Sequence, residues 1–400
     1  MKDWQIVKLG ELYSVHNGLS KGRQFFGTGF PFLTFSNVFN NWFLPNELDS
    51  LVQTTEKERV ACSIKLGDVF ITRTSETMNE LGMSSVALKD YPNATYNGFT
   101  KRLRPITDRV LPNFIGYYLR SPKFRGKFMA FSSMTTRASL ANNDLLNMEI
   151  ELPSMEVQNR IASILSRYDS LIANYQQQIK LLEEAAQRLY KEWFVDFRFP
   201  GHENTQIVDG VPEGWEKKRL EDLVFDSSKR ITKKDRGLYE CYMPIDCLPK
   251  KQLSYIDSKS VEQAESSLIT FSRGDIIFGA MRPYFHKVCF ARHSGITRTT
   301  CFVLRAKKIE YEAFASMLLF DEETVKYASS ISVGTTMPYT RWSDFKKMEI
   351  VVPTIEIAVI FNTKVSNILT TCERFASQIV LLTEARDRLL PKLMNGEIEV

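Results

Sequence analysis

The sequence predicts an α+β protein that is built twice. We expect two β-rich globular domains separated by two long antiparallel coiled-coil helices, with a pseudo-two-fold internal repeat. Three observations support this. The stretch MEIELP at 148–153 returns as MEIVVP at 348–353. Each copy precedes a long segment with helical spacing of apolar residues. The segments before each copy contain short aromatic and β-branched runs separated by Gly, Pro and Asn, as β-rich domains do.

The repeat extends well beyond these six residues. At an offset of 200, identical residues recur from Pro153 and Pro353 to Leu189 and Leu389. Upstream, Trp4 resembles Trp215, and IKLGDVFI at 64–71 resembles FSRGDIIF at 271–278, but the offset drifts. Insertions and deletions have therefore accumulated in the N-terminal part of each repeat, whereas the C-terminal part has kept its register.

The constant part of each repeat is predicted to be a helix of about 36 residues, far longer than the usual ~11–12. Its apolar residues follow a heptad seam with one stutter. The first seam comprises Ile161, Ile164, Tyr168, Leu171, Tyr175, Ile179, Leu182, Ala186, Leu189 and Trp193. The second comprises Phe361, Val365, Ile368, Cys372, Phe375, Ile379 and Leu382, with Pro391 marking its end. Alternatively, each helix simply covers the core of one domain.

Chain order determines how two such helices pair. The first leaves the first domain and the second starts from the second domain, so packing along their length requires opposite directions. At 1.5 Å per residue, a helix of this length spans roughly 54 Å. The predicted segments are a domain at 1–152, a spacer helix at 153–199, a domain at 200–353 and a spacer helix at 354–400.

Composition is that of a globular protein with 44% hydrophobic and 25% charged residues. No apolar run reaches the roughly 18 residues of a membrane span, and the N-terminus lacks the apolar core of a secretory signal. The six scattered cysteines fit reduced cytosolic thiols. The net charge of +5 permits nucleic-acid binding without requiring it.

The order of domains and helices, together with several motifs, resembles the specificity subunit of type I restriction-modification systems. The motifs are LPSMEVQNRIASILSRYDSLI, LYKEWFVDFRFPG, GDVFITRTSE, TTRASL, GDIIFGAMRP and RLLPKLMNGEIEV, of which WFVDF is the most specific. The resemblance covers nearly the whole chain. It implies two target-recognition domains, each reading half of a bipartite asymmetric site in double-stranded DNA, on helices that set the gap between the halves.

The resemblance also implies partners in a bacterial or archaeal cytoplasm. Two modification subunits would dock on the helices and methylate adenine with S-adenosylmethionine, and restriction subunits would hydrolyse ATP with Mg. This chain is then expected to carry no cofactor or metal and to be a reader rather than an enzyme. Independently of the resemblance, Trp193, Phe194 and Phe197 are expected to wedge between the first helix and the neighbouring domain, with partner docking as the alternative.

DNA binding requires cations for phosphates and polar side chains for base edges, both on loops. The turns RTS and MRPY follow equivalent Gly-Asp strands, and TTRASL and TTMPYT precede equivalent strands. In the first domain we predict contacts from Lys21, Arg23, Ser36, Asn37, Arg73, Thr74, Ser75, Lys101, Arg102, Thr135, Thr136, Arg137 and Ser139. In the second we predict Lys229, Arg230, Lys233, Lys234, Arg282, Tyr284, Thr335, Thr336, Tyr339 and Arg341.

The sequence contains partial matches to catalytic motifs, but each lacks a required residue or structural context. GLSKG at 18–22 matches a nucleophile elbow, but no apolar strand leads into it. HENTQ at 202–206 lacks the second histidine of a zinc motif, and no P-loop or Asn/Asp-Pro-Pro-aromatic tetrapeptide occurs. Two alternatives to a DNA reader are a coiled-coil scaffold that binds only proteins, and a self-contained methyltransferase or nuclease. Salt-dependent binding to random duplex DNA separates the reader from the scaffold.

Overall fold

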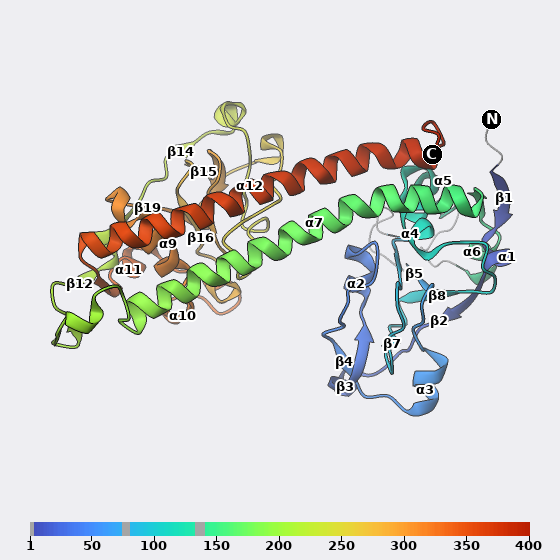
Figure 1. The fold of residues 1–400 in the computed structure, drawn as a ribbon, viewed down its shortest axis with the longest axis horizontal. Coiled ribbons are helices and arrows are strands. Elements are labelled where there is room, and N and C mark those ends of the chain that lie inside the picture. Colours follow the sequence, from blue (N-terminus) through green and yellow to red (C-terminus); the bar gives the residue numbers. More distant parts are fainter. Residues whose placement is uncertain (1–3, 74–80, 133–140) are drawn as a thin grey trace. The chain divides into compact units, whose positions relative to one another are not determined.

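The computed structural model describes residues 4–73, 81–132 and 141–400 (Figure 1). The chain divides into two compact units. The first unit comprises Met1–Ser170 and Thr383–Val400, and the second comprises Leu171–Leu382. These units cut across the predicted segments, because each globular part packs on stretches of both long helices.

The first unit contains a four-stranded sheet in the order β2-β8-β5-β6, a three-stranded sheet in the order β4-β3-β7, and the antiparallel pair β1-β9. Short helices cover the sheets. The elements are β1 (Gln5–Lys8), α1 (Leu9–Leu12), β2 (Tyr13–Asn17), β3 (Phe26–Leu33), α2 (Phe35–Asn40), β4 (Leu51–Val52), α3 (Glu56–Ala61), β5 (Val69–Thr72), β6 (Ser84–Val86), β7 (Thr95–Tyr96), β8 (Thr100–Pro105), α4 (Pro112–Arg120), α5 (Pro122–Ser132), α6 (Asn142–Leu146) and β9 (Glu149–Leu152).

The second unit repeats this plan with sheets in the orders β13-β19-β16-β17 and β14-β15-β18 and the antiparallel pair β12-β20. A two-stranded β10-β11 hairpin precedes it. The elements are β10 (Ile207–Val208), β11 (Val211–Pro212), β12 (Glu216–Arg219), α8 (Leu220–Leu223), β13 (Val224–Asp226), β14 (Arg230–Ile231), β15 (Leu268–Phe271), β16 (Ile276–Gly279), β17 (Val288–Phe290), β18 (Gly295–Arg298), β19 (Cys301–Ala306), α9 (Glu312–Phe320), α10 (Glu322–Ser330), α11 (Trp342–Phe345) and β20 (Glu349–Val352). The predicted β-rich α+β class and the internal repeat are therefore confirmed.

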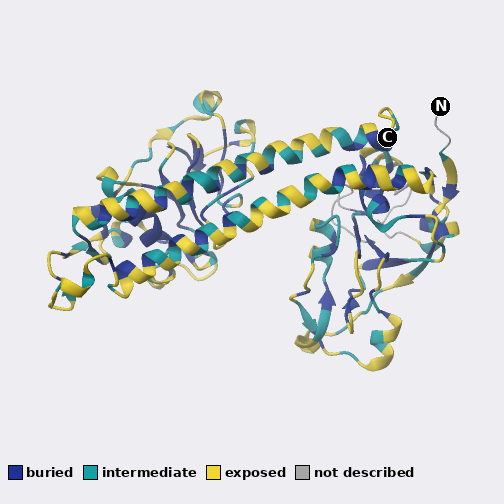
Figure 2. Ribbon diagram, in the orientation of Figure 1, coloured by how far each residue is buried: buried dark blue, intermediate teal, exposed yellow. Residues whose placement is uncertain are grey.

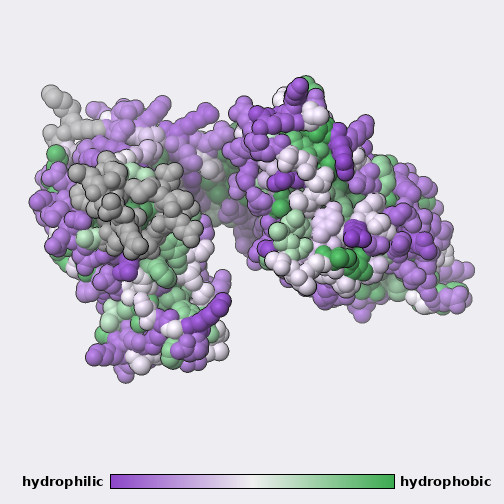
Figure 3. Space-filling view, turned by 180° about the vertical axis from the view of Figure 1, so that it is seen from behind, coloured by the Kyte–Doolittle hydropathy of each residue, from purple (hydrophilic) through white to green (hydrophobic). Residues whose placement is uncertain are grey.

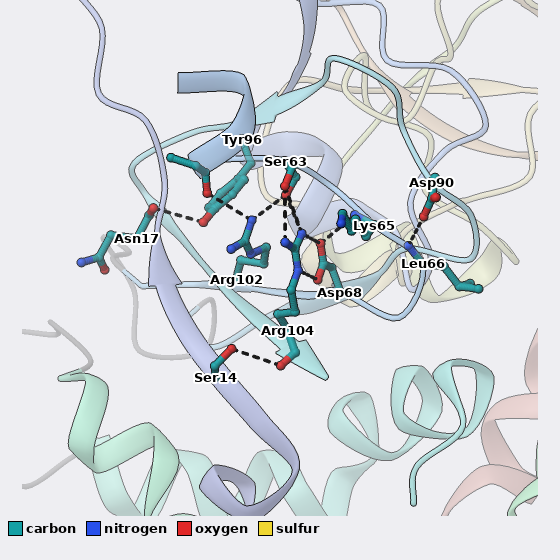
Figure 4. A network of polar contacts seen from close by, with 11 residues as sticks. Ser14, Asn17, Ser63, Lys65, Leu66, Asp68, Asp90, Tyr96, Arg102 and Arg104 are labelled. Atoms are coloured by element: carbon teal, nitrogen blue, oxygen red, sulfur yellow. Dashed lines mark hydrogen bonds and ion pairs between the residues drawn. The ribbon is translucent and has the colours of Figure 1, made fainter. Parts of the chain in front are cut away.

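The recurring Gly-Asp turn shows why this part of the sequence is repeated. Gly67 and Gly274 have φ of 84° and 89°, a left-handed conformation that glycine adopts without strain. The following carboxylate is fully buried in both units. Asp68 receives both donors of the Arg104 fork at 2.9 and 2.7 Å, as Figure 4 shows.

In the second unit, Asp275 accepts the equivalent pair of hydrogen bonds from Arg305 at 2.6 and 3.1 Å. Each carboxylate also accepts a backbone N–H three residues upstream, from Lys65 or Ser272, at 2.7 Å. A buried carboxylate needs such partners. The repeated Gly-Asp pair is thus a structural device that joins the turn to the central strand β8 or β19.

The two long helices are α7 (Met155–Tyr190) and α12 (Ile355–Met394). Within the second unit, the rings of Tyr175 and Phe375 stack with centroids 4.9 Å apart, and Ile179 packs with Cys372. Residue numbers rise along one helix while they fall along the other, so the helices are antiparallel there, as predicted. Within the first unit, Asp169 forms an ion pair with Arg386 at 2.6 Å, and Ile161 and Leu165, earlier on α7, share a core with Leu390 and Leu393, later on α12, so the helices are antiparallel there too.

Some details of the predicted helices are wrong. Leu171 was expected in the seam but is 46% exposed, and Ile172 packs inward instead. A straight α-helix drifts by about 20° per heptad relative to a strict seven-residue repeat, so the inward face moves to the next residue. Pro391 was expected to end α12, but the helix continues to Met394. Proline removes only one hydrogen bond there, which a last helical turn tolerates better than a helix interior.

Two residues of the predicted aromatic wedge, Trp193 and Phe194, are confirmed as part of the core, and the third, Phe197, is partly buried against it. Trp193 and Phe194 lie in a π-helical turn (Lys191–Val195) and are 5% and 7% exposed. The Phe194 ring lies 4.7 Å from those of both Phe314 and Phe361, centroid to centroid. Figure 2 shows buried residues gathered in the sheets and short helices of each unit, while α7 and α12 alternate buried, intermediate and exposed positions.

The cysteines and the helices can be compared with the expected reduced thiols and the expected lack of a membrane span. All six cysteines carry free thiols, and five of them are buried. Over the residues that the structure describes, no helix combines the length and hydrophobicity needed to cross a membrane.

Candidate nucleic-acid interface

Two segments predicted to bind DNA lie against each other in the second unit. Met281 and Tyr339 form a β-bridge. The backbone N–H of Arg282 donates to the Pro338 carbonyl at 2.7 Å, and its Nη2 donates to the Thr336 carbonyl at 3.2 Å. The turn after β16 and the loop before β20 therefore form one surface, although more than 50 residues separate them in sequence.

Arg282 occupies an unusual position in this surface. Its φ is 50°, in the left-handed region that non-glycine residues rarely adopt. The side chain is half-buried, and its Nε has no hydrogen-bond partner among the described residues. A buried guanidinium donor without a partner is costly, and a phosphate or base edge would satisfy it.

The corresponding turn of the first unit also contains an arginine, two positions closer to the strand. Arg73 directly follows β5, and its backbone N–H donates to the Phe99 carbonyl at 3.0 Å. Its Nε also has no partner within the described ranges. The predicted neighbours lie outside the residues that the structure describes. They are Thr74, Ser75, Thr135, Thr136, Arg137 and Ser139.

The loop before α11 forms a short hairpin that projects polar side chains. Val333 and Tyr339 exchange backbone hydrogen bonds at 3.0 Å, and the Tyr339 hydroxyl donates to the Thr299 carbonyl at 3.3 Å. Thr335 and Thr336 are exposed at the tip. Two further predicted residues are exposed, namely Tyr284 in the turn after β16 and Arg341 at the start of α11.

The basic residues around β14 remain at the surface. Lys229, Arg230 and Lys234 are exposed and form no ion pair within the described part of the chain. Lys233 is also exposed but pairs with Glu265 at 2.7 Å. An exposed pair of this kind contributes little stability and is screened by salt, so Lys233 stays available to an anionic ligand.

One residue in this region was missed by the sequence prediction. Arg298 ends β18 and is exposed next to Thr299, whose carbonyl receives the Tyr339 hydroxyl. The sequence feature that could have indicated Arg298 is its position in TRTT, directly before β19. This place corresponds to the end of the β7-β8 connection in the first unit. Seen from behind, the surface of the second unit mixes hydrophilic side chains with paler ones of intermediate hydropathy (Figure 3).

Two predicted contacts in the first unit are wrong. Lys101 and Arg102 are only 5% and 2% exposed, because they belong to β8, which lies between β2 and β5. Arg102 donates to the Ser63 carbonyl at 2.6 Å and lies over the Tyr96 ring (Figure 4). Lys101 bonds to the side-chain oxygen of Asn142. Both cations therefore form hydrogen bonds inside the unit and are not displayed on its surface, contrary to the prediction.

The remaining predicted residues of the first unit have mixed surroundings. Arg23 is exposed in a short 3₁₀ turn. Lys21 forms an ion pair with Glu58 at 2.7 Å, and this interaction lowers the Glu58 pKa to about 2. Ser36 is exposed and accepts a hydrogen bond from Asn40. Asn37 uses its side-chain oxygen to cap α2 by accepting bonds from Thr34, which leaves only its amide NH₂ for a ligand.

The fold is that of a duplicated protein in which each α+β unit places an arginine in the turn after its Gly-Asp strand. The chain belongs to the family described as the type I restriction modification DNA specificity domain, whose model matches residues 1–184 and 212–380. The sequence is similar to specificity subunits of type I restriction enzymes over its full length. It is 27% identical to the MjaIX subunit of Methanocaldococcus jannaschii, with 94% of that protein covered.

Two further similarities extend the comparison. The chain is 24% identical to the HindI specificity subunit of Haemophilus influenzae, over the whole of both chains. A solved type I restriction-modification S subunit from M. genitalium has the same fold. Its TM-score is 0.55 at 13% identity, with 98% of this chain and 96% of that one covered.

Proposed function

We propose that this chain is the DNA-recognition subunit of a type I restriction-modification complex, in which each unit reads one half of a bipartite asymmetric target. The observation that carries this proposal is that each unit places an arginine in the turn after its Gly-Asp strand. Arg73 lies five residues after Asp68 and Arg282 lies seven residues after Asp275, and the Nε of each has no hydrogen-bond partner among the described residues. Two related readers that have diverged independently suit an asymmetric target, because each can change its half-site without altering the other.

We also propose that α7 and α12 set the gap between the half-sites. The support is their length of 36 and 40 residues and their antiparallel contacts within each unit. A helix of 36 residues is roughly 54 Å long, whereas one turn of B-DNA is about 34 Å. Insertion of whole helical turns at equivalent places in both helices is expected to lengthen the unread gap.

The helices are further proposed to dock two modification subunits. Leu181 and Leu381 occupy equivalent positions of α7 and α12, and they are 53% and 58% exposed. Exposed leucines that recur at an offset of 200 fit two related contacts with copies of one partner. Methylation with S-adenosylmethionine, and restriction with ATP and Mg, would then belong to partner subunits, and this chain would contribute recognition without catalysis.

Exchange of one unit's recognition domain tests the proposal. Residues 1–152 are replaced by the corresponding domain of a relative, the complex is assembled with modification subunits, and methylated adenines are mapped across a genome. We expect one half-site to change while the other half-site is retained. A change in both half-sites would show that the units do not read independently, and an unchanged target would show that the first unit does not read DNA.

Salt dependence separates this proposal from a protein-only scaffold. A reader should lose affinity for random duplex DNA steeply as salt rises, since phosphate contacts release counterions. A scaffold would show no binding to titrate. A self-contained methyltransferase or nuclease would instead bind its cofactor or cleave DNA as the purified chain.

A further inference from the structure

Phe99 presents its ring to solvent in the β7-β8 connection of the first unit. The side chain is 63% exposed, the largest exposed fraction of any aromatic side chain among the described residues. Its backbone is nevertheless fixed, because its N–H donates to Oδ1 of Asn97 at 2.9 Å, and Nδ2 of Asn97 donates to the Leu33 carbonyl at 3.1 Å. The hydroxyl of Thr100, which is fully buried, donates to the Asn97 carbonyl at 2.9 Å. The turn is therefore held in place while most of the ring stays uncovered.

The pairing of β5 with β8 places Phe99 beside Arg73, whose Nε has no hydrogen-bond partner in the described ranges. Thr72 lies opposite Thr100, so Arg73 and Phe99 form the next pair outward, and the Arg73 N–H donates to the Phe99 carbonyl at 3.0 Å. Directly opposite residues of an antiparallel pair have side chains on the same face, with Cβ atoms about 4.5–5.5 Å apart. An arginine and an exposed aromatic ring are thus neighbours at one end of this sheet.

The second unit has small side chains at the corresponding positions. There Gly279 lies opposite Cys301, and the next pair outward is Ala280 and Thr300, with the Ala280 N–H donating to the Thr300 carbonyl at 2.9 Å. Ala280 lies five residues after the aspartate of its Gly-Asp turn, as Arg73 does. The exposed ring is therefore a feature of one unit at a place that both units share. A side chain that differs between two readers at such a place is suited to making their half-sites different.

A phenylalanine ring can select only an apolar feature of DNA, because it has no N–H or O–H to donate and no lone pair to accept with. In the major groove that feature is the 5-methyl group of thymine, which B-DNA already exposes. The faces of the bases are also apolar, but a side chain reaches them only after costly unstacking. We infer that Phe99 is a specificity-determining residue that packs on a thymine methyl group in the first half-site, an inference that rests on the proposed function.

Phe99→Ala tests this role in the complex assembled with modification subunits. Methylated adenines mapped across a genome should show that the wild type requires a T·A pair in the first half-site besides the methylated one. The variant should accept other pairs at that position and keep the second half-site. The matched control is Leu66→Ala, which truncates a side chain that is 56% exposed at the other end of β5 and should leave the motif unchanged.

The outcomes of the mapping separate the two proposals. If the wild type required no such T·A pair, or if Phe99→Ala kept the wild-type motif, the role of Phe99 would be overturned and the proposed function would stand. If the wild-type complex methylated no bipartite motif, the proposed function would be overturned together with it.

Replacement of thymine by uracil tests the contact without changing the protein, because uracil pairs with adenine in the same way and lacks only the methyl group. Labelled duplexes with the mapped target, each with one thymine of the first half-site replaced by uracil, are titrated with the complex and followed by anisotropy. One of them should bind the wild type about fourfold more weakly, the effect of losing one buried methyl group. In Phe99→Ala this difference should vanish, whereas uracil in the second half-site should affect both proteins alike. Equal affinity of the wild type for every duplex, or a loss that persists in Phe99→Ala, would overturn the inference.

Discussion

Replacement of Arg282 by alanine should weaken DNA binding without unfolding the second unit. Within the described ranges, the side chain makes one hydrogen bond, from Nη2 to the Thr336 carbonyl in an exposed hairpin. Loss of such a bond costs about 1 kcal/mol or less. Residue 282 has a left-handed backbone and is not glycine in the wild type or in the alanine variant, so the substitution adds no new backbone strain.

The expected loss of affinity follows from the unsatisfied donor. If Nε and its charge meet one phosphate, the slope of log K against log salt should become less negative by about 0.9, and binding to random duplex should weaken roughly tenfold. If the fork reads a base instead, the loss should be about 1–3 kcal/mol at one position of the second half-site and small on random DNA. The half-buried guanidinium with one fork nitrogen already committed favours the phosphate contact.

Anisotropy titrations of a labelled duplex between about 50 and 200 mM salt measure both quantities. Arg388→Ala is the matched control, because that side chain is 83% exposed on α12 and belongs to no predicted contact. A variant that combines Arg73→Ala with Arg282→Ala should show about twice the change in slope. If Arg282→Ala and Arg388→Ala gave the same slope and affinity as the wild type, the arginine turn would not contact DNA.

Three further predictions concern stability and can be measured by chemical or thermal unfolding. Asp68→Asn and Asp275→Asn should each destabilise their own unit by about 2–3 kcal/mol, below the 3–5 kcal/mol of a fully buried pair because the arginine partners are partly exposed; limited proteolysis should find the other unit unchanged, and equal loosening of both units would contradict this. Glu183→Ala should cost about 2 kcal/mol, because its buried carboxylate accepts the backbone N–H groups of residues 253 and 254 at 3.2 and 2.7 Å. A change at its partly exposed neighbour Glu184 should stay within about 0.5 kcal/mol. Burial lowers the pKa of His286 below 6.5, so the folded state binds a proton at this side chain less readily than the unfolded chain, and stability should fall as the pH drops from 6.5. In His286→Gln the loss of stability with falling pH should be shallower. An equal loss in the variant would show that other groups cause it.

Much of the architecture could be predicted because its signals are local and repeated. The heptad spacing and the returning MEI motif predicted both long helices, and the WFVDF block predicted the wedge of Trp193 and Phe194. The recurrence of RTS and MRPY after the same strand predicted the arginine turns. Repetition helped here because two copies of a motif that have drifted in offset mark the positions that the fold requires.

The failures share a different physical cause. The residues of a central strand covered on both faces do not distinguish it from a half-exposed strand. The basic run of β8 was therefore predicted to bind phosphates, although Arg102 donates a hydrogen bond to the Ser63 carbonyl inside the unit. The inward shift from Leu171 to Ile172 depends on the drift of a straight helix, which becomes visible only when both partners are placed. The sheet partners and the helix partners come from distant parts of the chain.

The division of the chain has a consequence for biosynthesis. Leu390, Leu393 and Met394 belong to the hydrophobic core that contains Val7, although the residues of the entire second unit lie between them in the sequence. On the ribosome, the second unit has all its residues in one continuous stretch and can close as soon as that stretch emerges. The first unit must wait, with part of its core unsealed, until translation has passed residue 394. The domain translated first is thus completed last, and chaperones have the longest access to the half that begins the polypeptide.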